Sequence, residues 1–110
     1  MQKLSLEARV REHLERARAA TTDRSAETVY GGHEHVLRQT VIALRAGAEM
    51  SEHDNPGEAT LLVLRGRVRM HSEAESWDGM TGDLLIVPPA RHSLVALEDS
   101  AALLTVAKAP

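Results

Sequence analysis

The sequence predicts an all-β protein with one amphipathic helix at its N-terminus. From residue 25 onward, short apolar or alternating segments are separated by turn-forming residues about every ten positions, which is typical of a β-sandwich or β-barrel. Residues 5–20, in contrast, place apolar side chains at helical spacing. The chain of 110 residues is long enough for one domain with a hydrophobic core.

The composition excludes several classes of function. Hydrophobic residues make up 43% of the chain but aromatic residues only 2%, so the core must consist of Leu, Val, Ile and Ala. So few rings argue against single-stranded nucleic-acid binding, and a net charge of −3 provides no basic field for DNA or anionic lipid. Without cysteine there is no disulfide and no thiolate site. No apolar run resembles a signal peptide or a membrane span, so we expect a cytoplasmic protein without nucleic-acid or membrane partners.

Residues 1–24 are expected to form the helix and a linker, with residues 21–25 as the polar connection. Ser5 can cap the helix, because a serine side chain accepts a hydrogen bond from a backbone N–H of the first turn. Four apolar residues share one face of the helix: Leu6, Val10, Leu14 and Ala17. We expect this face to pack on the rest of the protein or across a dimer.

The next segment predicts a short strand over residues 27–30 and a long one over residues 36–44. Between them, His33 and His35 would share a face of a strand and could bind a metal, but beside a glycine pair a solvated loop is the simpler interpretation. Both faces of the long strand include a polar residue, for example Gln39 on one face. Alternation therefore does not decide which face lies inside.

The stretch from Gly47 to Gly66 places a histidine between two turns. His53 precedes Pro56-Gly57, which predicts a tight turn because proline presets one φ and glycine tolerates a positive φ. Residues 60–64 are aliphatic and β-branched, which predicts a buried strand. Gly66 then reverses the chain.

Four further strands are predicted after this turn, at residues 67–71, 84–87, 93–97 and 101–107. We interpret His71 as a surface residue and Trp77 as a packing residue in front of an Asp78-Gly79 hairpin turn. Residues 84–87 predict another buried strand. Pro88-Pro89 should end it, because proline has no backbone N–H to donate a hydrogen bond to a neighbouring strand.

The stretch from Gly47 to Gly66 resembles a motif of the cupin family. That motif runs glycine, five residues, His-x-His, three or four residues, glutamate, six residues, glycine. The stretch Gly47–Gly66 is similar to it, with His53 at the first histidine, Asn55 at the second and Ala59 at the glutamate.

Residues 82–92 resemble the second cupin motif, which runs glycine, five residues, proline, x, glycine, two residues, histidine. Ala90 replaces the glycine, and His92 arrives one residue early. If this slip rotates the strand by one residue, His92 faces outward and Ser93 inward. The resemblance covers residues 36–107.

The resemblance implies a small single-domain cupin of the conserved-barrel type, in which residues 25–110 form a jelly-roll barrel (double-stranded β-helix). Cupins hold a divalent metal through three histidines and a glutamate, and Zn, Fe, Mn, Ni and Cu all suit such ligands. In this sequence the set is eroded, because only His53 and His92 match and Asn55 is a poorer ligand. Glu58 supplies a carboxylate only if a bulge turns it inward.

The predicted ligand pocket comprises Gln39, His53, Asn55, Glu58, Arg91 and His92. Arg91 either clamps a carboxylate or phosphate of a ligand or lies in solvent. Three hypotheses follow: an enzyme acting on a small molecule, with a metal on His53, His92 and Glu58 or with a histidine as general base; a metal-free barrel that binds or senses a small molecule; and a structural partner protein. The resemblance also implies a homodimer, and the sequence does not choose a reaction or a ligand.

Overall fold

The computed structural model describes residues 2–53 and 57–108. Over this part of the chain it contains one helix and nine strands: α1 (Leu6–Ala19), β1 (Arg24–Gly31), β2 (Leu37–Leu44), β3 (Glu49–His53), β4 (Gly57–Arg65), β5 (Arg67–Ser72), β6 (Ser76–Met80), β7 (Leu84–Ile86), β8 (His92–Ala96) and β9 (Ser100–Lys108). The predicted all-β architecture with one N-terminal helix is confirmed.

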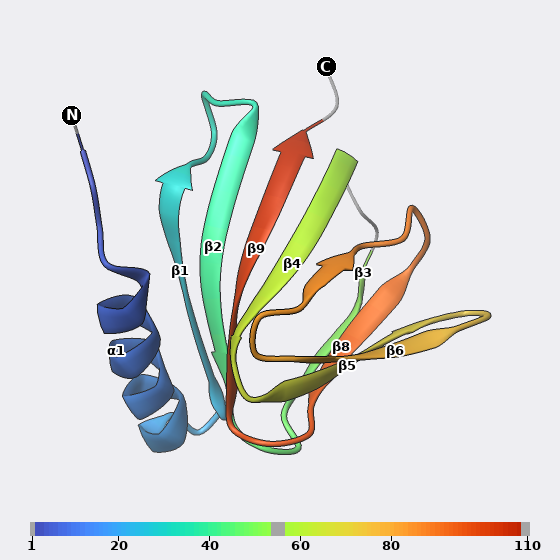
Figure 1. The fold of residues 1–110 in the computed structure, drawn as a ribbon, viewed down its shortest axis with the longest axis horizontal. Helices are drawn as coiled ribbons and strands as arrows, with labels where there is room; N and C mark the ends of the chain where they lie inside the picture. Colours follow the sequence, from blue (N-terminus) through green and yellow to red (C-terminus); the bar gives the residue numbers. More distant parts are fainter. Residues whose placement is uncertain (1, 54–56, 109–110) are drawn as a thin grey trace.

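The strands form two antiparallel sheets (Figure 1). The larger sheet has the order β1-β2-β9-β4-β7, and the smaller sheet has the order β3-β8-β5-β6. Most neighbours are far apart in the sequence: β9 lies between β2 and β4, and β8 lies between β3 and β5. The barrel is therefore assembled from long-range pairings rather than from successive hairpins.

The space between the two sheets is filled by aliphatic side chains and one methionine. The buried members of this core are Ile42, Leu44, Ala59, Leu61, Val63, Val68, Met70, Val87, Leu94, Ala96, Ala102 and Val106. Ile42 and Leu44 settle the orientation of β2, because alternation then puts Gln39, Val41 and Ala43 on the outer face of the larger sheet.

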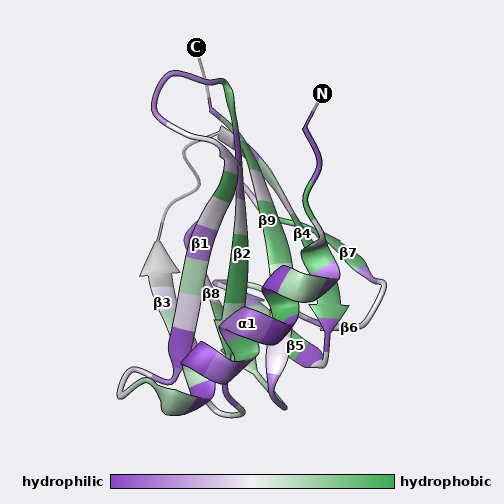
Figure 2. Cartoon of the chain, turned by 90° about the vertical axis from the view of Figure 1, so that its left-hand side faces the viewer, coloured by the Kyte–Doolittle hydropathy of each residue, from purple (hydrophilic) through white to green (hydrophobic). Residues whose placement is uncertain are grey.

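Helix α1 lies across that outer face (Figure 2). The Ser5 side chain caps the helix by accepting a hydrogen bond from the Ala8 N–H at 3.2 Å. Four of the residues in its contact with the sheet are fully buried, and they are Val10, Ala17, Ala43 and Ala101. Leu14 is buried among them, so the predicted apolar face is confirmed, with Leu6 only partly covered at its end. No helix of the described residues is long and apolar enough to cross a membrane.

Two strands differ from the prediction, β1 in its start and β3 in its presence. The strand predicted at residues 27–30 is β1 and already begins at Arg24. It is an edge strand that starts with the polar residues Arg24 and Ser25, so its start shows no apolar signal. The strand β3 was not predicted at all, because Glu49, Ser51 and Glu52 interrupt any apolar pattern.

Asp78-Gly79 does not form the predicted hairpin turn but lies within β6. Asp78 stands opposite Arg69 on β5, and the guanidinium donates two hydrogen bonds to its carboxylate at 2.6 and 3.0 Å. Gly79 packs so closely that a Cβ would lie 3.1 Å from the Leu85 side chain and 3.2 Å from that of Val63. The glycine is therefore required by packing across the barrel and not by a turn.

Candidate functional site at the barrel mouth

His92 begins β8 and is only 6% exposed. The register of β8 against β5 is regular, and Leu94 and Ala96, two and four residues further on, belong to the barrel core. Side chains two residues apart on a strand share a face, so His92 faces the interior. The one-residue shift in the second motif allowed His92 to face either inward or outward. In the structure His92 faces inward, and Ser93 is on the opposite face.

The orientation of the His92 ring is fixed by a backbone carbonyl two residues earlier in the chain. Its Nδ1 lies 2.8 Å from the carbonyl oxygen of Ala90. A carbonyl only accepts hydrogen bonds, so Nδ1 bears a proton and, in the neutral ring, the lone pair is on Nε2. This is the arrangement that orients histidines which accept a hydrogen bond from a ligand or bind a metal through the second nitrogen.

His53 ends β3 on the neighbouring strand. In the antiparallel pairing of β3 with β8, His53 is the Cα partner of His92, after an irregularity in the register that follows Met50. The backbone therefore brings together the two histidine positions, which are 39 residues apart in the sequence. Asn55, the predicted second ligand of the first motif, lies outside the described residues.

The carboxylate position of the first motif contains no donor in the barrel interior. Ala59 is 8% exposed and belongs to the core. Its neighbour Glu58 is exposed and stands opposite Ala107, and β4 pairs regularly with β9 from Gly57 to Val63. The bulge that would turn Glu58 inward is absent from this part of β4, so Glu58 points to the outer face of the larger sheet.

No family model matches the sequence, and no curated protein matches it. Solved structures do match in fold. A conserved protein of unknown function from Streptococcus pyogenes is 26% identical, with a TM-score of 0.73, over 83% of this chain and 79% of that chain. A cupin superfamily protein from Desulfitobacterium hafniense DCB-2 is 16% identical, with a TM-score of 0.72, over 78% of both chains. The protein has the cupin fold.

A third similar structure is a salicylate 1,2-dioxygenase from Pseudaminobacter salicylatoxidans, with 20% identity and a TM-score of 0.75. The alignment covers 91% of this chain but only 33% of the dioxygenase, so this chain spans about a third of that protein. At these identities the likeness extends to the fold of a single cupin barrel.

The described donors of this cupin barrel do not form a complete metal site. Among the residues whose side chains the structure describes (2–51 and 57–108), no three His, Cys, Asp or Glu side chains gather into a group that could hold a metal ion. His33 and His35 are exposed in the loop between β1 and β2, where the His35 ring lies 5.6 Å from that of Tyr30. His71 is exposed at the end of β5, as expected.

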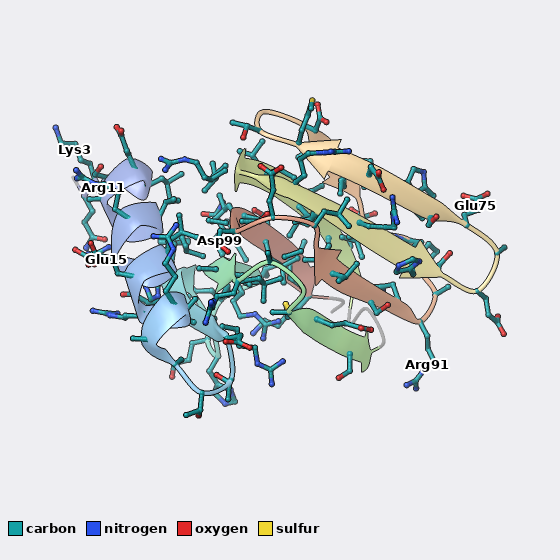
Figure 3. The ribbon with its side chains drawn as sticks, turned by 90° about the horizontal axis from the view of Figure 1, so that it is seen from below. Lys3, Arg11, Glu15, Glu75, Arg91 and Asp99 are labelled. Atoms are coloured by element: carbon teal, nitrogen blue, oxygen red, sulfur yellow. The ribbon has the colours of Figure 1, made fainter. Side chains whose placement is uncertain are left out.

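Gln39 and Arg91, two further residues of the predicted pocket, do not face the interior. Gln39 lies on the outer face of the larger sheet, where its Nε2 donates a hydrogen bond to the Thr105 hydroxyl at 3.2 Å. Arg91 is exposed and projects away from the barrel (Figure 3). Of the predicted residues, the structure thus brings together His53 and His92.

A hollow of about 550 Å³ lies at the β4 and β7 side of the larger sheet. It is lined by residues of β4, β7 and β9, among them Glu58, Thr60, Ile86 and Thr105. Thr105 alternates with Val106, a core residue, so this part of the hollow lies on the outer face of the larger sheet, while the core residues Ala59 and Val87 also line it. His92 is not among its lining residues.

A polar cluster that the sequence reasoning missed connects α1 to β1. His13 is 1% exposed, and its Nδ1 and Nε2 lie 2.6 Å from the Ser25 hydroxyl and 2.8 Å from a Glu27 carboxylate oxygen. An ionised carboxylate only accepts, so Nε2 donates to Glu27, and this hydrogen bond lowers the pKa of the Glu27 carboxyl below its ordinary value. The available signal was the spacing of His13, three residues after Val10 and four before Ala17, on the buried face.

Proposed function

We propose that this cupin binds a small organic acid at the mouth of its barrel, between His53 and His92, without a tightly bound metal. The observation that favours binding is the inward, buried and backbone-oriented His92 directly opposite the His53 position. The observation that favours a metal-free site is Ala59, which fills the carboxylate position with a core methyl group.

The chemistry of the pair suits a carboxylate ligand. An imidazole that is protonated on both nitrogens donates a hydrogen bond to a carboxylate oxygen, and a neutral one accepts from a protonated acid. The apolar core residues beneath, such as Met70 and Leu94, would contact the hydrocarbon part of the ligand.

A second candidate function is a metal-dependent cupin enzyme that acts on a small molecule. It is favoured by the hydrogen bond from His92 Nδ1 to the Ala90 carbonyl, which leaves the lone pair on Nε2, as in histidines that bind Zn, Fe, Mn, Ni or Cu. A catalytic site of this kind generally has three protein ligands, and Glu58 does not supply the third.

Metal analysis distinguishes the two candidates. Protein purified without chelator should contain far less than one transition metal ion per chain, and titration with Zn²⁺ should show no tight stoichiometric binding, because only two histidines are available. A stoichiometric metal that is lost in His53→Ala and kept in His71→Ala would contradict the metal-free proposal and support the enzyme.

Binding of organic acids is tested by NMR with acetate, succinate and benzoate as probes. At least one of them should shift backbone amide resonances of β3 and β8 in the wild-type protein. His92→Ala should abolish these shifts, whereas His71→Ala, which changes an exposed histidine, should preserve them. Shifts that survive in His92→Ala, or no shift with any of the three acids, would overturn the proposed site.

A further inference from the structure

The strand β7 exposes apolar side chains, although residues 84–87 had been predicted as a buried strand. Leu84 and Ile86 are 56% and 68% exposed, whereas Val87 is buried in the core. Ile86 stands opposite Thr60 of β4 and, like Leu84, points to the outer face of the larger sheet. The prediction was wrong for these two side chains because β7 is an edge strand, and the main contacts of α1 with this sheet are to β1, β2 and β9.

The hollow of about 550 Å³ lies beside Ile86 and has a mixed lining. In the pairing of β4 with β9, Thr60 is the partner of Thr105 and Glu58 is the partner of Ala107, and these four side chains belong to the outer face of the sheet. The described lining is apolar apart from two hydroxyl groups and one carboxylate. The volume lies within the range of about 300–1,000 Å³ that is usual for small-molecule sites.

Glu58 is the only charged side chain among the described residues that line the hollow. Within residues 2–51 and 57–108, no Lys, Arg or His side chain forms an ion pair with it. Lys108, which follows Ala107 on β9, is engaged elsewhere, because its Nζ donates hydrogen bonds to the carbonyl oxygens of Gly32 and His33 at 2.6 and 3.3 Å. The hollow therefore offers a carboxylate to a cation that the described chain does not supply.

The two threonine hydroxyls add further hydrogen-bond acceptors. The Thr105 hydroxyl accepts a hydrogen bond from Gln39 Nε2 at 3.2 Å. A hydroxyl oxygen has two lone pairs, so it can accept a second hydrogen bond from a ligand. A primary ammonium group has three N–H donors and no acceptor, which matches a site whose polar groups are a carboxylate and two hydroxyl oxygens.

We propose that this hollow binds a small primary amine with an apolar body. The ammonium group pairs with Glu58 and the threonine hydroxyls, and the hydrocarbon part lies on Ile86 and Pro89. An anionic ligand would meet the like charge of Glu58, and a neutral one would gain no attraction from it. The site is separate from the pair of histidines, since His92 does not line the hollow, and it selects the opposite charge from the proposed organic acid.

Methyl NMR of isoleucine-labelled protein tests the proposal with phenethylamine as the probe. The chain contains two isoleucines: Ile86 lines the hollow, and Ile42 is 5% exposed in the core. Phenethylamine should shift the Ile86 methyl resonances in a saturable way and leave those of Ile42 in place. Phenethyl alcohol and hydrocinnamate, which carry a neutral and an anionic group on the same hydrocarbon, should bind more weakly by about threefold or more. No saturable shift of Ile86 with phenethylamine, or equal affinity for the alcohol, would overturn the proposal.

The variant Glu58→Gln removes the charge and keeps the size of the side chain. It should weaken phenethylamine binding by about threefold or more. Glu75→Gln is the matched control, because Glu75 is an exposed glutamate in the turn between β5 and β6 and its substitution changes the net charge of the chain by the same amount (Figure 3). This variant should bind phenethylamine as the wild-type protein does. Wild-type affinity in Glu58→Gln, or equal losses in both variants, would contradict recognition by Glu58.

Backbone amide resonances distinguish this site from the barrel mouth. Phenethylamine should shift the amides of Thr60 and Thr105, and it should do so equally in His92→Ala, because His92 does not line the hollow. Retained binding in this variant would support a separate amine site. Loss of amine binding in His92→Ala, or amide shifts confined to β3 and β8, would place the amine in the barrel mouth and overturn the proposal.

Discussion

The outer face of the larger sheet has two halves with different covers. On the β1–β2–β9 side, Val10 and Leu14 of α1 are 2% and 4% exposed. On the β7 side, Leu84 and Ile86 have similar chemistry but are more than half exposed. The comparison shows that apolar side chains on two parts of one sheet face can differ widely in burial, because the main contacts of α1 with this sheet are to β1, β2 and β9.

The covered half also contains the polar cluster of His13, Ser25 and Glu27. It fixes α1 to the edge strand β1, where the apolar contact ends. The Ser25 hydroxyl can donate to a neutral imidazole and accept from a protonated one, so the contact keeps both hydrogen bonds in either state of the ring. The helix is thus held by packing along its middle and by directional hydrogen bonds at the sheet edge.

The largest expected effect concerns the covered half. Leu14→Ala should lower the free energy of unfolding by about 2–5 kcal/mol, because it leaves a cavity between the helix and the sheet. Glu12→Ala, at an exposed position where the carboxylate pairs with Arg9, should change it by no more than about 0.5 kcal/mol. Urea denaturation measures both. Equal effects of the two substitutions would show that the helix packs through another face.

A smaller, pH-dependent effect is expected at Glu27. Its pKa is lower in the folded protein than in the unfolded chain, mainly through the hydrogen bond from His13. The carboxylate therefore stabilises the fold fully at pH values above the ordinary pKa of a glutamate, and this contribution is lost as the pH falls through the lower, folded pKa. Wild-type protein and Glu27→Gln should differ in melting temperature at neutral pH and converge in acid.

The His13→Ala background provides the control for this prediction. Without the imidazole, Glu27→Gln should have little effect at any pH, because the interaction between the two residues is already absent. A difference between Glu27→Gln and its parent that persists in the His13→Ala background, or that grows as the pH falls, would contradict the assigned role of the hydrogen bond.

The smallest effect is expected in the open half. Leu84→Ala should change the free energy of unfolding by no more than about 0.5 kcal/mol, since its side chain is already largely in water. Urea denaturation measures this change. A large loss of stability would mean that the Leu84 side chain is covered within the single chain, and the contrast between the two halves would then disappear.

Several features of the site could be predicted from local sequence. Glycine and proline positions indicated the frame of the strands, and His92 was correctly expected at the junction of a turn and a strand. The orientation of His92 could not be predicted, because the early histidine left two registers open and only the pairing of β8 with β5 selects one. The orientation of Glu58 could not be predicted either. It depends on whether β4 contains a bulge in its pairing with β9, which lies 42 residues or more away in the chain.

The sequence by itself determined the elements with a strong local cause. Ser5 and the apolar spacing of α1 define a helix, and the aliphatic composition of residues 60–64 and 101–107 defines strands, because these preferences act between near neighbours. Only the tertiary structure decided which face of each strand is inside, since alternation groups side chains by face but does not say which face is covered. The burial of His13, the exposure of Ile86 and the pairing of His53 with His92 all follow from contacts between distant segments, and no local pattern specifies them.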